Sequence, residues 1–158
     1  MLKSRTLAGA VIGGVLAASA TAANSQSRDA VAGITETLAG YERALNGSDT
    51  DAVMALYAPD GVFMPQHFPS AVGAEQVRAA YDGVFGAIKL DVVFEIAEVV
   101  PVAEDWAFAR TNSSGTVTIL ANGQSGPEAN QELFVFQRLA GDWKIARYAF
   151  STINPPRN

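Results

Sequence analysis

The sequence predicts an α+β fold, in which a cone-shaped, curved antiparallel sheet of four to six strands and three N-terminal helices enclose an apolar pocket. Three observations predict it. Apolar residues recur at spacings of three and four through the first half of the chain, as on the buried face of a helix. After Gly86 the pattern changes to segments rich in Val, Ile and Phe, which are typical of strands. The chain has 158 residues, 49% of them hydrophobic, which is enough for one domain with a core of its own.

Two helices are predicted first. Residues 28–46 place one apolar stripe on a helix, and Asn46-Gly47 is expected to end it; the stripe contains Val31, Ile34, Leu38, Tyr41 and Leu45. Asp49 is expected to cap a second, shorter helix through Tyr57, because its carboxylate can accept from the free N–H groups of the first turn.

A short strand and a third helix follow. Pro59-Asp60-Gly61 predicts a turn, residues 62–64 a strand, and residues 66–72 a loop. The third helix opens at Gly73 and continues to about Val84, with Val77 and Tyr81 facing inward.

The second half is predicted to be an antiparallel meander. Its expected strands are residues 90–102, 106–112, 115–120, 132–138 and 143–151. Residues 122–127 are expected to form a loop, and Ala140-Gly141-Asp142 a tight turn. Residues 113–116, Ser-Ser-Gly-Thr, indicate a bulge or a strand edge.

The first 22 residues resemble a secretory signal peptide. Lys3 and Arg5 supply positive charge, an apolar run begins at Leu7, and small residues up to Ala22 match the A-x-A pattern of cleavage sites. The alternative is an uncleaved membrane anchor, but the run to Ala20 has 14 residues where a span needs about 20. We therefore expect a periplasmic or secreted protein, without stable membrane association after cleavage. The domain then covers residues 27–153, and residues 154–158 form a loose tail.

Composition narrows the function classes. The net charge is −5, and removal of Lys3 and Arg5 leaves nine basic residues against 16 acidic ones, or −7. Such a chain repels phosphate backbones, so nucleic acid is not an expected partner. One histidine and no cysteine give little basis for a metal site, and no glycine-rich phosphate loop occurs after the signal peptide. No cofactor and no metal are therefore predicted.

The stretch 41–65, YERALNGSDTDAVMALYAPDGVFMP, carries the phrases A-L-N-x-x-D-x-D and A-L-Y-A-x-D. In these phrases and in its order of elements the chain resembles the ketosteroid-isomerase-like and SnoaL-like proteins of the nuclear-transport-factor-2-like superfamily. The ending GDWKIARYAFS resembles the SgcJ/EcaC-type branch. The resemblance covers nearly all of the chain after residue 22. It is specific for the fold and weak for function, since the superfamily mixes enzymes, binding modules and assembly domains.

The resemblance to the steroid isomerases implies site residues. Tyr41 matches a tyrosine that donates to a substrate carbonyl, and Tyr57 and Tyr81 match the tyrosines that support it. Glu132 matches a protonated acid that completes an oxyanion hole, and Phe150 matches an aromatic pocket wall. The alternative interpretation makes the three tyrosines ordinary core residues and pairs Glu132 with a cation such as Arg110 or Arg147.

The chain departs from the isomerases at the base. They carry an acid before a proline after the second helix, whereas here Met64 precedes Pro65, and a thioether cannot abstract a proton. His67 is a candidate substitute for the base, and a solvated loop histidine is the alternative. Met64 and Trp106 are candidate ligand contacts, although core or dimer packing is the stronger expectation for Trp106.

These observations predict a pocket protein that binds a small apolar molecule bearing a carbonyl or hydroxyl group. Isomerase-like, cyclase-like or dehydratase-like activity stays open. The alternative is a non-enzymatic homodimer whose pocket is filled by its own side chains, so an open cavity would favour the first reading. A homodimer is expected in either case, because residues 133–136 are apolar on both faces of their strand.

Overall fold

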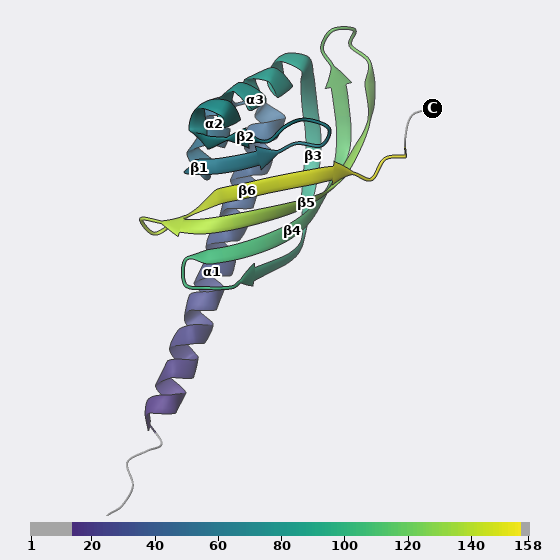
Figure 1. Ribbon diagram of the computed structural model, residues 1–158. Helices are drawn as coiled ribbons and strands as arrows, with labels where there is room; N and C mark the ends of the chain where they lie inside the picture. Colours follow the sequence, from purple (N-terminus) through teal and green to yellow (C-terminus); the bar gives the residue numbers. More distant parts are fainter. Residues whose placement is uncertain (1–13, 156–158) are drawn as a thin grey trace, which may run out of the picture.

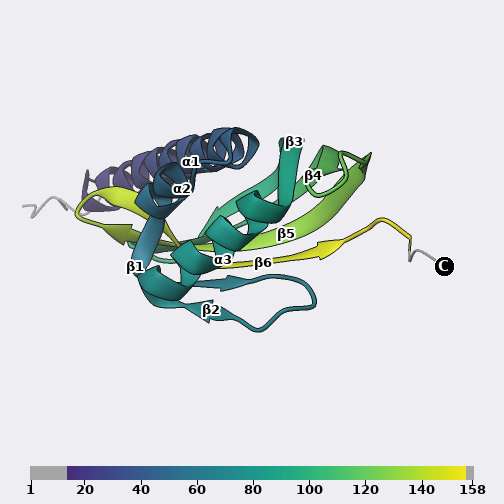
Figure 2. The ribbon, with the colours of Figure 1, turned by 90° about the horizontal axis from the view of Figure 1, so that it is seen from above.

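The computed structural model describes residues 14–155, with side chains from residue 25 onward (Figure 1). Three helices lie on one side of a six-stranded sheet in this part of the chain, as Figure 2 shows from above. The helices are α1 (Gly14–Gly47), α2 (Thr50–Leu56) and α3 (Gly73–Ala87). The predicted α+β fold with a curved sheet is confirmed. None of the described helices is both long and apolar enough to cross a membrane.

Helix α1 is longer than predicted. It begins at Gly14 rather than residue 28, so it runs through the expected cleavage site after Ala22. Residues 1–13 of the predicted signal peptide lie outside the described residues. The buried stripe contains Ile34, Leu38 and Tyr41 as expected, but Ala30 is buried in place of Val31, which is 36% exposed. One position rotates a side chain by about 100° on a helix, which turns Val31 away from the sheet.

The expected cap of α2 is confirmed, but its end differs from the prediction. The carboxylate of Asp49 accepts a hydrogen bond from the Ala52 N–H at 2.9 Å. The helix ends at Leu56, and Tyr57 is the first residue of strand β1 (Tyr57–Met64). Because Tyr57 pairs with Ile145 on the last strand, sheet pairing replaces the helical turn predicted there. The predicted loop 66–72 contains the two-residue strand β2 (Ala71–Val72).

The remaining strands form the predicted meander. They are β3 (Ile88–Pro101), β4 (Trp106–Ile119), β5 (Ser125–Leu139) and β6 (Asp142–Thr152). The strand order in space is β2-β1-β6-β5-β4-β3. The purely antiparallel sheet of the prediction is wrong in one pair, because β1 runs parallel to β6. Strand β2, helix α3 and three strands of the meander lie between β1 and β6 in the sequence. This long connection lets β6 lie beside β1 in the parallel direction.

The prediction of two separate strands at residues 106–112 and 115–120 is also wrong, because one strand, β4, covers nearly all of both ranges. The strand is continuous through Ser113–Thr116, and its register with β3 and β5 shows no bulge there. The register shifts instead between Ile96 and Glu98 on β3, and between Val135 and Phe136 on β5. Such shifts bend strands locally, which suits the curved sheet of Figure 1.

Side chains of α1 fasten the helix to the edge strand β3. Asn46 donates from Nδ2 to the Val92 carbonyl at 2.7 Å and accepts from the Val92 N–H at 2.9 Å. One turn earlier, Glu42 accepts from the Phe94 N–H at 2.8 Å. These bonds satisfy backbone groups that an edge strand would otherwise expose. They also fix the distance between α1 and the concave face of the sheet, where the cavity lies.

The core lies between α1, α3 and the concave face. Ile34 and Leu38 of α1 meet Phe134, Phe136 and other inward strand residues, all nearly inaccessible to solvent. Burial of one such side chain contributes roughly 1.5–3 kcal/mol. At the far end Asn154 donates from Nδ2 to the Pro127 carbonyl at 3.1 Å, so the predicted loose tail is fastened at its first residue. Residues 156–158 of that tail lie outside the described residues.

Candidate functional site

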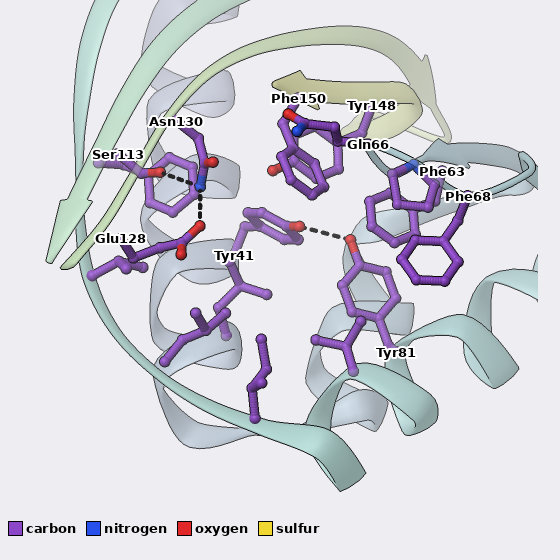
Figure 3. Close-up of a pocket in the computed structure, with 17 residues that line it drawn as sticks. Tyr41, Phe63, Gln66, Phe68, Tyr81, Ser113, Glu128, Asn130, Tyr148 and Phe150 are labelled. Atoms are coloured by element: carbon purple, nitrogen blue, oxygen red, sulfur yellow. Dashed lines mark hydrogen bonds between the residues drawn. The ribbon is translucent and has the colours of Figure 1, made fainter. Parts of the chain in front are cut away.

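A cavity of about 230 Å³ lies between α1, α3 and the concave face of the sheet (Figure 3). Its wall is mostly apolar and combines aromatic rings with aliphatic side chains, among them Phe63, Leu90, Phe94 and Phe150. Pro65, Gln66 and Phe68 also line it, and they belong to the loop after β1. Phe68 is 74% exposed, which places this loop where the cavity meets solvent. The apolar pocket expected from the sequence is therefore present and open.

Three tyrosine hydroxyls form a chain beside this cavity. The Tyr41 and Tyr81 hydroxyl oxygens lie 2.6 Å apart, and those of Tyr81 and Tyr57 lie 2.9 Å apart. Tyr41 and Tyr81 line the cavity, whereas Tyr57 lies behind Tyr81 (Figure 3 shows the first pair). Burial is the main cause that raises the pKa of each of the three phenols. All three are therefore neutral at neutral pH and keep their protons for donation.

The three linked phenols have one more donor proton than the hydrogen bonds between them use. Three phenols carry three protons, and the two hydrogen bonds of the chain use two. If Tyr57 donates to Tyr81 and Tyr81 to Tyr41, the Tyr41 proton is left for the neighbouring Tyr148 hydroxyl or for a group in the cavity that both tyrosines line. The opposite direction would leave the spare proton at Tyr57, which does not line the cavity. An acceptor on a ligand beside Tyr41 would favour the first direction.

Glu132 lies on the inner face of β5 and is 4% exposed. It accepts hydrogen bonds from the hydroxyls of Thr111, at 2.5 Å, and Ser113. The predicted pairing with Arg110 or Arg147 does not occur, because Arg110 pairs with Glu98 and Arg147 with Asp60. Burial raises the Glu132 pKa against the opposing effect of the two hydroxyl donors. Glu132 itself does not line the cavity, but its partner Ser113 does.

The cavity residues that sequence reasoning missed include three polar ones, Ser113, Glu128 and Asn130, and the aromatic Tyr148. For most of them, the alternation of side chains along a strand could have predicted an inward position. Side chains two apart share one face of a strand, so the inward assignment of Glu132 applies also to Asn130 and Glu128. The same rule links Tyr148 to Phe150. The prediction failed because it began the strand at Glu132, whereas β5 begins at Ser125.

Besides Tyr57 and Glu132, three further predicted site residues do not line the cavity. Met64 follows the inward Phe63 on β1 and is 36% exposed. Trp106 is half-buried and alternates with the fully buried Ala107, so it lies on the opposite face of β4. His67 is exposed, and its ring nitrogen Nε2 lies 2.6 Å from Nε2 of the neighbouring Gln66. The structure brings Tyr41, Tyr81 and Phe150 together in the cavity wall. Tyr57 and Glu132 lie behind this wall, and each is hydrogen-bonded to a lining residue, Tyr81 and Ser113 respectively.

Aromatic packing holds the Tyr41 ring in place. It meets Phe134 and Tyr148 edge to face, with ring centroids 5.5 Å and 5.4 Å away. Such contacts contribute about 0.5–1.5 kcal/mol each beyond their buried area. The hydroxyl is therefore fixed in position before any ligand arrives. No group of three or more metal-ligating side chains occurs among the described residues.

Comparisons with known proteins agree with this fold. A structure of a ketosteroid isomerase-like protein from Erwinia carotovora atroseptica is 42% identical, with a TM-score of 0.76, over 78% of this chain and 96% of that one. A nuclear transport factor 2 superfamily protein from Salmonella enterica is 19% identical, with a TM-score of 0.67, over 77% of this chain and 89% of that one. A hexachlorocyclohexane dehydrochlorinase is 12% identical, with a TM-score of 0.69, over 78% of this chain and 85% of that one.

The two comparisons below 25% identity show the fold alone. No curated protein matches the chain. The family model of the SnoaL-like domain matches residues 38–148, a span that contains every cavity residue named above except Phe150. On this match, which covers more than half of the chain, the protein belongs to the SnoaL-like family.

Proposed function

We propose that this protein binds a small, mostly apolar molecule through one oxygen acceptor, a carbonyl or a hydroxyl, held by the Tyr41 hydroxyl. The observation that carries the proposal is the position of Tyr41, which lines an apolar cavity and ends a chain of buried, neutral phenols. The Tyr41 hydroxyl is already bonded to Tyr81 and can still make a further hydrogen bond. A ligand acceptor at that point would add such a bond, which contributes about 0.5–1.5 kcal/mol.

The size of the cavity limits the ligand. Drug-sized ligands occupy pockets of roughly 300–1,000 Å³, whereas this cavity measures about 230 Å³. A protein cavity of about 150 Å³ lined by apolar side chains can hold benzene. The ligand class that fits is therefore a single substituted ring or a molecule of similar bulk. A steroid-sized body would need the loop with Phe68 to open.

Binding is better supported than isomerisation. Proton transfer needs a base within reach of the bound molecule, and neither Met64, at the position of the isomerase base, nor His67 lines the cavity. Glu128 is the carboxylate that does line it, and it accepts a hydrogen bond from Asn130 on the side of the cavity away from the Tyr41 hydroxyl. The alternative of a purely structural domain expects a pocket filled by its own side chains. The open cavity beside Tyr41 favours a ligand instead.

The test is calorimetric titration of the protein with 4-ethylphenol and with ethylbenzene, which has the same ring and no oxygen. We expect 4-ethylphenol to bind about tenfold more tightly, since one hydrogen bond contributes about 1.4 kcal/mol in such a site. Tyr41→Phe should remove this preference. Tyr57→Phe is the matched control, because it removes a hydroxyl that does not line the cavity. Equal affinity of the unaltered protein for both compounds would refute the proposal.

We also propose that the chain is exported, cut after Ala22 and dimeric. The basis is the N-terminal pattern of Lys3, Arg5 and the A-x-A motif, together with the apolar residues 133–136. A native mass spectrum of protein recovered from its host should show two chains that each begin near Ala23. Retention of Met1 would contradict cleavage of a signal peptide, and a monomer at tens of micromolar would contradict the dimer.

A further inference from the structure

The cavity has a second polar region, formed by Asn130, Glu128 and Ser113. In Figure 3 these three side chains lie on one side of the Tyr41 ring, and the Tyr41 hydroxyl points the other way, towards Tyr81. All three line the cavity. The proposed function makes no use of this region, so its hydrogen bonds can be considered separately.

The hydrogen bonds of Asn130 leave its oxygen without a partner. Asn130 is 9% exposed, and its Nδ2 donates to Glu128 Oε1 at 2.8 Å and to Ser113 Oγ at 3.4 Å. These two bonds use both protons of the amide nitrogen. The buried Oδ1 has no hydrogen-bond partner among the described residues.

The orientation of the amide is fixed by its neighbours. A flip would place Oδ1 against the Glu128 oxygen, so that two acceptors would face each other. It would also remove the donor to Ser113 Oγ, whose own proton is used in the bond to Glu132. The chain of donors therefore runs from Asn130 to Ser113 to Glu132, and Oδ1 can act only as an acceptor.

The Glu128 carboxylate in this region has no cationic partner among the described residues. Glu128 and Glu132 lie four residues apart on β5, with Asn130 between them, and the three share the inner face. None of the ion pairs between described residues includes either carboxylate. An unpaired carbonyl oxygen beside a carboxylate attracts a hydrogen-bond donor, and a cationic donor most strongly.

Aromatic rings complete the environment. Tyr148 and Phe150 line the same cavity, with ring centroids 5.9 Å apart. Aromatic faces stabilise a nearby cation by about 0.5–2 kcal/mol. The net charge of −5 also favours the approach of a cation over that of an anion.

We propose that Asn130 and Glu128 form a subsite for a protonated amino group, so that the ligand is a small ring-containing amine. This inference rests on the proposed function for the existence of a ligand, and it adds which charge the ligand carries. The amine would donate to Asn130 Oδ1 and to the Glu128 carboxylate while the apolar body fills the cavity.

Three probes that share one ring test the subsite by calorimetry at pH 7. They are tyramine, which carries an ammonium group, 4-ethylphenol, which is neutral, and 3-(4-hydroxyphenyl)propanoate, which is an anion. We expect tyramine to bind about tenfold more tightly than 4-ethylphenol, and the propanoate about tenfold less tightly. Glu128→Gln should bring the ratio of tyramine to 4-ethylphenol affinity close to one, while its amide oxygen can still accept from Asn130.

Glu104→Gln is the matched control, since it removes one negative charge from an exposed residue that does not line the cavity. It should keep the tenfold ratio. Equal binding of the three probes, or loss of the ratio in the Glu104 variant as well, would overturn the amine subsite. If 4-ethylphenol still bound better than ethylbenzene, the proposed function would stand without it. If no probe bound at all, both proposals would fall.

Discussion

Gly115→Ala is expected to lower the free energy of unfolding by about 3 kcal/mol, in the upper range for overpacked sites. Gly115 pairs with Val92 in the middle of the long β3–β4 ladder. A Cβ at this position would lie 2.1 Å from the Asp91 carbonyl oxygen and 2.8 Å from the Val92 Cα. Both atoms belong to the backbone, so they can move only if the two strands separate. Urea denaturation of the purified variant measures the loss.

Gly83→Ala provides the matched control for that substitution. Gly83 is exposed on α3, and a Cβ there would have no atom within 4 Å. Alanine is the better helix former by about 1 kcal/mol, so this variant should gain stability. A Gly115 variant as stable as the unaltered protein would show that the close approach of β3 and β4 is absent in solution.

Tyr81→Phe is expected to cost about 3 kcal/mol of stability, because the change leaves two buried hydroxyls without their bonds. Tyr81 stands in the middle of the chain, 2.6 Å from the Tyr41 hydroxyl and 2.9 Å from the Tyr57 hydroxyl. Phenylalanine would keep the ring stacked on Phe63, whose centroid lies 4.8 Å away. The loss therefore reports the hydroxyl alone, and thermal or urea unfolding measures it.

Tyr57→Phe should cost less, about 1 kcal/mol, because it removes the hydroxyl at one end of the chain and breaks one bond. The order of the two variants is the decisive result. If Tyr81→Phe were no more harmful than Tyr57→Phe, the three hydroxyls would not form a connected chain in solution.

The fold was largely predictable because its signals are local. The spacing of Ile34, Leu38 and Tyr41 on α1 and the cap at Asp49 follow from helix geometry, and both are confirmed. The parallel pairing of β1 with β6 could not be read in the same way, since it joins residues about 85 positions apart, such as Phe63 and Tyr148. Tyr57 was assigned to a helix for the same reason, because its strand forms only through that distant pairing.

Site residues could be predicted where the alternation of side chains along a strand places them. They could not be predicted where their position depends on where a strand begins. Glu132 and Phe150 lie on the inner face, as a period of two requires. Asn130 and Glu128 obey the same period, but glycine and proline at residues 126 and 127 disguised the start of β5 as a loop. Trp106 was proposed as a ligand contact without regard to its alternation with the buried Ala107, and this pattern turns it away from the cavity.

The central claim is that the Tyr41 hydroxyl holds the oxygen of a small ligand inside the cavity. A crystal structure of the protein grown with 4-ethylphenol tests this most directly. We predict the ring between Tyr148, Phe150 and Leu90, with its oxygen about 2.7 Å from the Tyr41 hydroxyl oxygen. A cavity that stays without the compound at saturating concentration, or a ring whose oxygen faces away from Tyr41, would contradict the account.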